Sequence, residues 1–113
     1  IPKRLLIVGG GIIGLEMATI YDALGSEITI VELCEQLIPT ADKDIINPLF
    51  KRVKKIYSNI FLNTKVTKIT AIKKGIKVSF EGKDAPKTDT FDKVLVSIGR
   101  SPNGHLLDAE KAG

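Results

Sequence analysis

A glycine-rich turn between an apolar run and a helical pattern constrains this chain more than any other feature. Residues 5–8 read Leu-Leu-Ile-Val, and Gly9, Gly10, Gly11 and Gly14 follow them. A continuous apolar run is typical of a parallel strand that is buried on both faces. Gly9 permits a turn too tight for a side chain, Gly11 lets a pyrophosphate approach the backbone, and Gly14 lets the helix pack closely on the strand.

The residues after this turn predict a helix and a second strand. Gly25 stands where a helix C-terminus favours glycine, and it follows apolar residues at helical spacing: Ile13, Met17, Ile20 and Leu24. The β-branched run at 28–31 ends at Glu32, which lies 18 residues after Gly14 (32 minus 14). That spacing is close to the roughly 20 residues expected for an acidic partner of a ribose. The pattern predicts a β–α–β unit that binds a dinucleotide. The alternative is a β–α–β unit whose glycines only shape the turn.

Composition restricts the remaining function classes. With 113 residues, 27% of them charged and 43% hydrophobic, the chain has the size and composition of one globular domain. It has no apolar run of about 18 residues and no signal-peptide pattern, so we expect no membrane partner. The net charge is +4, with a basic cluster at 51–55. We interpret this cluster as a solvated helix face and expect no nucleic-acid partner, because aromatic residues are not interleaved with it.

Cysteine usage and the chain start add two expectations. Cys34 is the only cysteine, so neither an intrachain disulfide nor a C-x-x-C pair can form. The single cysteine agrees with a cytoplasmic location. No residue is predicted to be catalytic or to bind a metal. The chain begins with Ile1 directly before its first strand, which suggests a piece excised from a longer protein.

The rest of the chain predicts one more helix and several strands. Asp42 is a candidate N-cap for a helix that runs to about Tyr57. Pro48 either removes a hydrogen bond within that helix or marks its restart after Asn47. Apolar runs at 60–62 and 94–99 predict parallel strands, whereas the alternation at 65–72 and 75–80 predicts antiparallel ones, with an edge strand at 84–91 after them. The predicted fold class is α/β: a Rossmann-like parallel sheet with helices on both faces and an antiparallel β-meander as the last crossover.

Four segments together resemble a known family over essentially all 113 residues: 9–16, 29–32, 63–66 and 97–103. They resemble the NAD-binding domain of the flavin-dependent pyridine nucleotide–disulfide oxidoreductases. Within that family, Glu32 and the segment 38–44 are most similar to the bacterial dihydrolipoamide dehydrogenases. The resemblance implies a domain inserted within the FAD domain of a homodimeric enzyme. That enzyme serves 2-oxo acid dehydrogenase complexes and passes electrons from dihydrolipoamide through a redox disulfide and FAD to NAD.

The chain departs from the complete family pattern. The paired cysteines, the FAD-binding glycine motif and the C-terminal catalytic histidine are absent from this sequence. His105 follows Pro102, Asn103 and Gly104 in a terminal loop, and it does not match the catalytic histidine of the family. We therefore expect the chain alone to be inactive, with NAD as its cofactor and FAD bound only by the full-length protein.

The resemblance also implies cofactor contacts at particular positions. Glu32 would accept hydrogen bonds from the adenosine ribose, Val66 would flank the adenine, and Gly99 lies at the carboxyl edge of the last strand. Glu16 would lie near the nicotinamide; alternatively it is a first-turn acid favoured by the helix dipole. The pyrophosphate would be lined by a continuous segment: Gly9, Gly10, Gly11, Ile12, Ile13 and Gly14. Leu15 is a further expected cofactor-binding residue.

Rival interpretations keep the fold and change the ligand or the role. An NADP-linked relative, similar to glutathione or mercuric reductase, would place a 2′-phosphate beside Glu32, and Leu33 and Cys34 offer no arginine to offset the repulsion. An S-adenosylmethionine or FAD site is a further rival, the latter disfavoured by the ending at 98–100. The last rival interpretation is a non-catalytic interaction domain, and the intact glycines of the motif argue against it.

Overall fold

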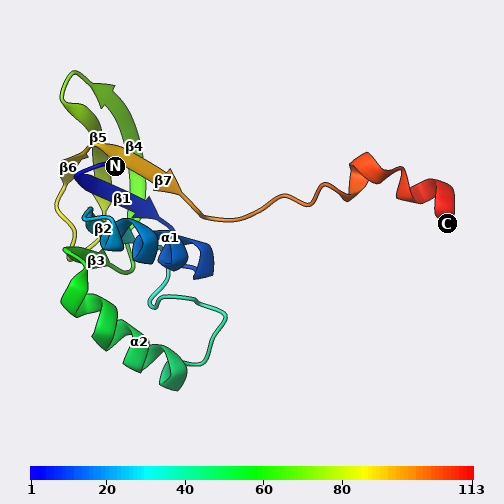
Figure 1. Cartoon of the computed structure of the whole chain (residues 1–113), viewed down its shortest axis with the longest axis horizontal. Helices are drawn as coiled ribbons and strands as arrows, with labels where there is room; N and C mark the ends of the chain where they lie inside the picture. The colour runs from blue at the N-terminus through cyan, green and yellow to red at the C-terminus, as the bar shows by residue number, and fades with distance from the viewer.

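A four-stranded parallel sheet and a three-stranded antiparallel sheet form the body of the molecule (Figure 1). The computed structural model describes residues 1–113, except for the side chain of His105, so the expectation for that histidine lies outside what is described. The parallel sheet has the order β3–β2–β1–β7, and the antiparallel sheet has the order β4–β5–β6. The elements in chain order are β1 (Arg4–Val8), α1 (Ile12–Ala23), β2 (Glu27–Val31), α2 (Lys43–Ile56), β3 (Asn59–Phe61), β4 (Lys65–Ile72), β5 (Gly75–Glu81), β6 (Thr88–Phe91), β7 (Lys93–Val96) and the 3₁₀ helices η1 (Gly104–Leu107) and η2 (Ala109–Ala112).

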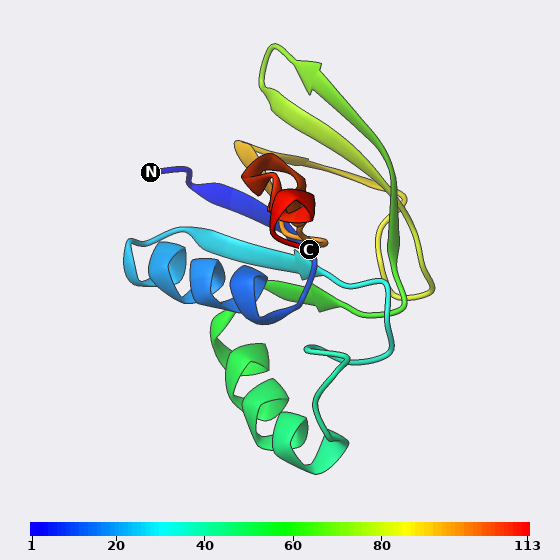
Figure 2. The same ribbon diagram turned by 90° about the vertical axis from the view of Figure 1, so that its right-hand side faces the viewer.

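The two faces of the parallel sheet are covered by different kinds of structure (Figure 2). One face, which includes Leu5 and Ile30, packs against the buried residues of both α1 and α2. The other face, which includes Leu6 and Val31, packs against side chains of β5 and β6 such as Phe80. The α/β class, the parallel sheet and the antiparallel meander are confirmed. The expectation of helices on both faces is wrong, because the β3-to-β7 crossover is the meander and occupies the face where a crossover helix would pack.

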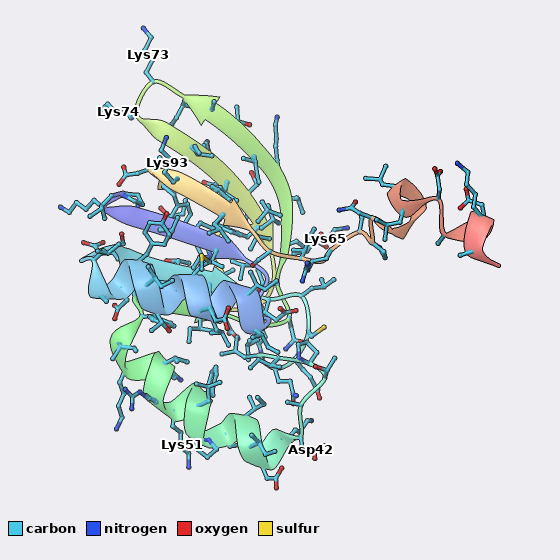
Figure 3. All side chains as sticks on the ribbon, turned by 45° about the vertical axis from the view of Figure 1, so that its right-hand side comes forward. Asp42, Lys51, Lys65, Lys73, Lys74 and Lys93 are labelled. Carbon is cyan, nitrogen blue, oxygen red and sulfur yellow. The ribbon has the colours of Figure 1, made fainter. Side chains whose placement is uncertain are left out.

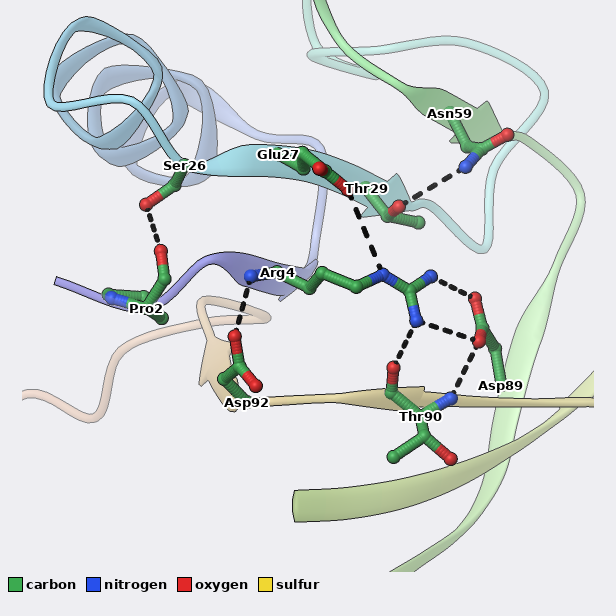
Figure 4. Close-up of polar contacts among 9 residues, drawn as sticks. All are labelled: Pro2, Arg4, Ser26, Glu27, Thr29, Asn59, Asp89, Thr90 and Asp92. Atoms are coloured by element: carbon green, nitrogen blue, oxygen red, sulfur yellow. Dashed lines mark hydrogen bonds and ion pairs between the residues drawn. The ribbon is translucent and has the colours of Figure 1, made fainter. Parts of the chain in front are cut away.

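Arg4 tethers the two sheets at the amino end of β1 (Figure 4). Its guanidinium nitrogens Nη1 and Nη2 donate to the two carboxylate oxygens of Asp89 at 3.2 and 2.8 Å, and Nη1 also donates to the Thr90 carbonyl. The Arg4 backbone N–H donates to Asp92 at 2.8 Å, and the guanidinium lies 5.1 Å from the centre of the Phe91 ring. The hydrogen bond to Asp89 raises the pKa of Arg4.

The helices resolve the alternatives that the sequence left open. The end of α1 is followed by Gly25 at φ +91°, as the C-terminal glycine predicted. Helix α2 continues through Pro48 from Lys43 to Ile56, and Asp42 is its N-cap residue without a side-chain cap hydrogen bond. Its basic side chains are exposed, with Lys51 pointing into solvent in Figure 3. No helix in the described part of the chain is long and apolar enough to cross a membrane.

Two strand boundaries differ from the sequence expectation. The edge strand β6 begins at Thr88 rather than near residue 84, because Pro86 cannot donate to a ladder. Strand β7 ends at Val96, and the Ser97 N–H makes the last contact with β1, at 2.8 Å from the Val8 carbonyl oxygen. After β7 the chain leaves the body as an extended segment (Figure 1).

Candidate functional site

A cavity of about 600 Å³ opens where β1, β2 and β7 end. In an open α/β sheet this carboxyl edge is the usual place for a ligand. Most of its wall comes from the residues that follow β1, β2 and β7 and from the start of β4. The lining residues are Val8, Gly9, Gly11, Val31, Glu32, Leu33, Cys34, Pro39, Thr64, Lys65, Val66, Ser97 and Ile98.

The three glycines of the motif have distinct geometric reasons to be glycine. Gly9 adopts φ +107°, and a Cβ there would lie 2.5 Å from the Ser97 carbonyl oxygen. A Cβ on Gly14 would collide with the carbonyl oxygen of Gly9, which is the close helix–strand contact that the motif predicted. A Cβ on Gly11 would meet no atom within 4 Å, yet Gly11 lines the cavity. A side chain at Gly11 would therefore take up space that a ligand could fill.

Two backbone N–H groups of the glycine turn already have hydrogen-bond acceptors within the protein, whereas those nearest the start of α1 do not. The Gly9 N–H donates to the Val31 carbonyl at 2.8 Å, and the Gly10 N–H donates to Glu32 Oε2 at 2.7 Å. Helix α1 begins at Ile12, so the amides of its first turn have no acceptor within the helix. Among the described residues, the Gly11 and Ile12 N–H groups donate to no protein acceptor. These donors and the positive end of the helix dipole suit an anion.

The Glu32 carboxylate is fixed at the cavity wall. It is only 8% exposed, and its two oxygens accept separate backbone hydrogen bonds: Oε2 from Gly10, and Oε1 from Cys34 at 2.9 Å. Each carboxylate oxygen has more than one lone pair, so both can accept a further bond from a ligand hydroxyl. The carboxylate is therefore already oriented without a ligand.

The residues after Glu32 and before β4 complete the other end of the cavity. Val66 and Cys34 both line it, and Cys34 is exposed. Desolvation, followed by the hydrogen bond and negative charge of Glu32, raises the pKa of the Cys34 thiol. Thr64 is buried, and its hydroxyl donates to the Leu62 carbonyl at 2.8 Å. Lys65, labelled in Figure 3, brings a cation to this wall.

Several residues expected to bind the cofactor do not line the cavity. Gly99 lies beyond its Ile98 wall, and Glu16 is exposed on α1. The first turn of α1 holds no acidic residue, so the interpretation of Glu16 as a first-turn acid is wrong. Gly10, Gly14 and Leu15, which are buried, and Ile12 and Ile13, which are exposed at the start of α1, do not line the cavity either.

Sequence reasoning missed Ser97, Lys65 and Pro39 in the cavity wall. Ser97 Oγ lies 3.2 Å from both the Val8 and the Gly9 carbonyl oxygens, so it contacts the glycine turn directly. The residue after a parallel strand lies at the carboxyl edge of its sheet, but the strand expected at 94–99 included Ser97. Because β7 ends at Val96, Ser97 is the edge residue in the structure.

These features define a Rossmann-like α/β domain with its candidate site at the carboxyl edge of the parallel sheet. A family described as pyridine nucleotide-disulphide oxidoreductase matches residues 1–113. The chain belongs to this family.

Named relatives and solved structures agree with that assignment. The chain is 59% identical to a dihydrolipoyl dehydrogenase of Vibrio cholerae and 56% identical to one of Haemophilus influenzae, with 100% of the chain covered in both comparisons. It covers 24% and 23% of those proteins, so it spans about a quarter of their length. A Cu(II) complex of the HOCl-induced flavoprotein disulfide reductase RclA from Escherichia coli superposes with a TM-score of 0.79 at 30% identity, over 96% of this chain and 24% of that one. An NAD-dependent persulfide reductase from A. fulgidus gives a TM-score of 0.80 at 28% identity, over 99% and 20%.

Proposed function

We propose that residues 1–113 form the NAD(H)-binding domain of a flavoprotein disulfide oxidoreductase. The observation that carries this proposal is the pairing of two groups in one cavity. The buried Glu32 carboxylate is held beside the glycine turn, whose Gly11 and Ile12 amides are available to an anion. A carboxylate accepts from two ribose hydroxyls, and the amides donate to phosphate. NAD carries the ribose hydroxyls and the phosphates on adjacent parts of one molecule.

The dimensions of the site suit this ligand. The cavity of about 600 Å³ has a mostly apolar wall that includes Val66, Pro39 and Leu33. Gly11 leaves open space where a pyrophosphate would approach the backbone. When bound, NAD accepts a hydride at its nicotinamide. This chain would bind the pyrophosphate at residues 9–14, orient the ribose through Glu32 and pack Val66 against the adenine. The exposed Glu16 and Gly99 would lie at the nicotinamide end.

The whole protein would then be a dihydrolipoamide dehydrogenase. The relatives of that name are about four times as long as this chain, and they support a domain inserted within a longer FAD-dependent polypeptide. Exposed apolar side chains at Ile98, Leu106 and Leu107 would contact the rest of that polypeptide. The FAD site and the redox disulfide would lie outside these residues. We further propose a cytoplasmic homodimer that serves 2-oxo acid dehydrogenase complexes and reoxidises their dihydrolipoamide.

One observation favours NADP(H) as a second candidate ligand. Lys65 lines the cavity, and an ammonium group there could attract a 2′-phosphate. Glu32 opposes this, because it is buried at the same wall and would repel the phosphate.

The test is a fluorescence titration of the chain with NADH, NADPH and FAD under identical salt conditions. We expect NADH to saturate at a concentration at least about tenfold below NADPH, since one charge-assisted hydrogen bond is worth about that factor. Equal affinity for NADH and NADPH would favour the Lys65 alternative. Preference for FAD, or no binding of any of the three, would contradict the proposed function.

A further inference from the structure

The segment that contains Leu37 and Ile38 folds back onto the glycine turn. The Ile38 N–H donates to the Gly10 carbonyl oxygen at 2.9 Å. Leu37 is completely buried, and its Cδ2 lies 2.6 Å from the position that a Cβ on Gly10 would occupy. A side chain at position 10 would have to displace the Leu37 side chain. The contact joins residues 28 positions apart (38 minus 10), so no local pattern requires it.

The backbone of Ile38 is in an unfavourable conformation. Its φ is +45°, in the left-handed region that β-branched residues rarely adopt. Neighbouring contacts hold it there. Gln36 Nε2 donates to the Ala41 carbonyl at 2.8 Å, the Ala41 N–H donates to the Ile38 carbonyl at 2.9 Å, and an ion pair joins Glu35 to Lys43. Such strain persists where the surrounding structure fixes it, and it concentrates at functional sites.

The Ile38 hydrogen bond determines the direction of the Gly11 amide. The Gly10 carbonyl and the Gly11 N–H belong to one peptide group, and the chain contains no cis peptide bond. In a trans peptide the C=O and N–H point in opposite directions. With the carbonyl held by Ile38, the Gly11 N–H must point away from Ile38. The preceding peptide is fixed in the same way, since its N–H at Gly10 is held by Glu32.

We infer that Leu37 and Ile38 form a positioning segment that orients the Gly11 amide toward the pyrophosphate of the cofactor. Ile38 acts through Gly10 and is a positioning residue, with no contact to the ligand required. This inference rests on the proposed function and adds the reason for the left-handed isoleucine. Because the amide is fixed before the ligand arrives, binding does not have to order it.

Two substitutions at Ile38 separate the hydrogen bond from the side chain. Ile38→Pro removes the N–H and requires φ near −65°, so it should release the Gly10 carbonyl. Ile38→Gly keeps the N–H and adopts φ +45° without strain, so it is the matched control. The probes are NADH, ADP and adenosine, of which only adenosine lacks phosphate. Thermal unfolding first checks that each variant is folded.

We expect Ile38→Pro to weaken NADH and ADP by about tenfold to a hundredfold, the usual loss for hydrogen bonds to a charged group, with adenosine affinity unchanged. Ile38→Gly should bind all three within about twofold of the original chain, because the N–H and its direction are kept. A purely structural role for Ile38 would not separate ADP from adenosine. If folded Ile38→Pro binds NADH and ADP like the original chain, the positioning role is wrong.

Amide NMR on the unsubstituted chain decides the question should Ile38→Pro fail to fold. The Ile38 amide should be protected from solvent exchange before any ligand is added. The Gly11 amide signal should shift with ADP and stay unmoved by adenosine. An unprotected Ile38 amide, or a Gly11 signal indifferent to ADP, overturns the inference. Failure of the original chain to bind NADH at all would instead contradict the proposed function.

Discussion

At the scale of single residues, Glu32 should determine which nicotinamide cofactor binds. Replacing it with alanine removes a carboxylate that is 8% exposed and bound to two backbone amides. Losing a charge-assisted hydrogen bond costs about 1.5–3 kcal/mol, so Glu32→Ala should weaken NADH by about tenfold to a hundredfold. NADPH should lose less or gain, because the like charge beside its 2′-phosphate is removed. Calorimetric titration of both cofactors measures the change in ratio.

A double variant sharpens that prediction. Leu33 follows Glu32, is exposed and lines the same cavity, so an arginine there can reach a phosphate at this wall. Glu32→Ala combined with Leu33→Arg should therefore favour NADPH over NADH. If both variants keep the original preference for NADH, selectivity does not reside at Glu32.

Gly11 provides a second prediction at the residue scale. The Cβ of a valine at this position would enter open cavity space, since no protein atom lies within 4 Å of it. Gly11→Val should therefore abolish detectable NADH binding and leave the far-ultraviolet circular dichroism almost unchanged. Gly25→Ala is a control for a glycine outside the site: its φ of +91° makes alanine costly for stability but not for binding. Retained NADH binding in Gly11→Val would place the phosphate elsewhere.

At the scale of elements, the Arg4 tether should stabilise the packing of the two sheets without affecting the cavity. It lies at the amino end of β1, whereas the cavity lies at the carboxyl end. Arg4→Ala loses a paired guanidinium that is partly exposed, so we expect about 1–2 kcal/mol less stability toward urea after allowing for solvent screening. NADH affinity should stay the same. Lys3→Ala removes an exposed charge next to it and should change stability by less than about 0.5 kcal/mol.

The elements also show how far sequence reasoning could go. Alternation at 65–72 and 75–80 correctly predicted antiparallel strands. In β5 the alternate positions Val78 and Phe80 are buried, whereas β4 is exposed along most of its length, with Ile69 and Ile72 included. Alternation does not report what a strand packs against, and helices were expected on both faces of the parallel sheet. Residues such as Ile38 and Ser97 were missed for a related reason. Both lie in segments that carry the family resemblance, but their contacts with the glycine turn are set by the path of distant parts of the chain, which sequence spacing does not report.

At the scale of the whole molecule, binding and chemistry should be separable. The sequence contains one cysteine, so the chain cannot form the disulfide that would accept electrons from a dithiol. The FAD-binding glycine motif of the family is likewise absent from this sequence. Hydride transfer needs a donor held against the nicotinamide, and such placement contributes much of an enzyme's rate. The chain should therefore bind NAD and leave it unreacted.

The corresponding assay mixes the purified chain with dihydrolipoamide and NAD and follows NADH absorbance at its near-ultraviolet band. We expect no rate above a protein-free blank. Added FAD should not restore activity, because free flavin lacks a fixed position relative to the nicotinamide. The Gly11→Val variant is the matched control, since any rate common to it and the original chain arises without the site. A rate that rises with chain concentration, survives repurification and disappears in Gly11→Val would show that these 113 residues contain a catalytic group of their own.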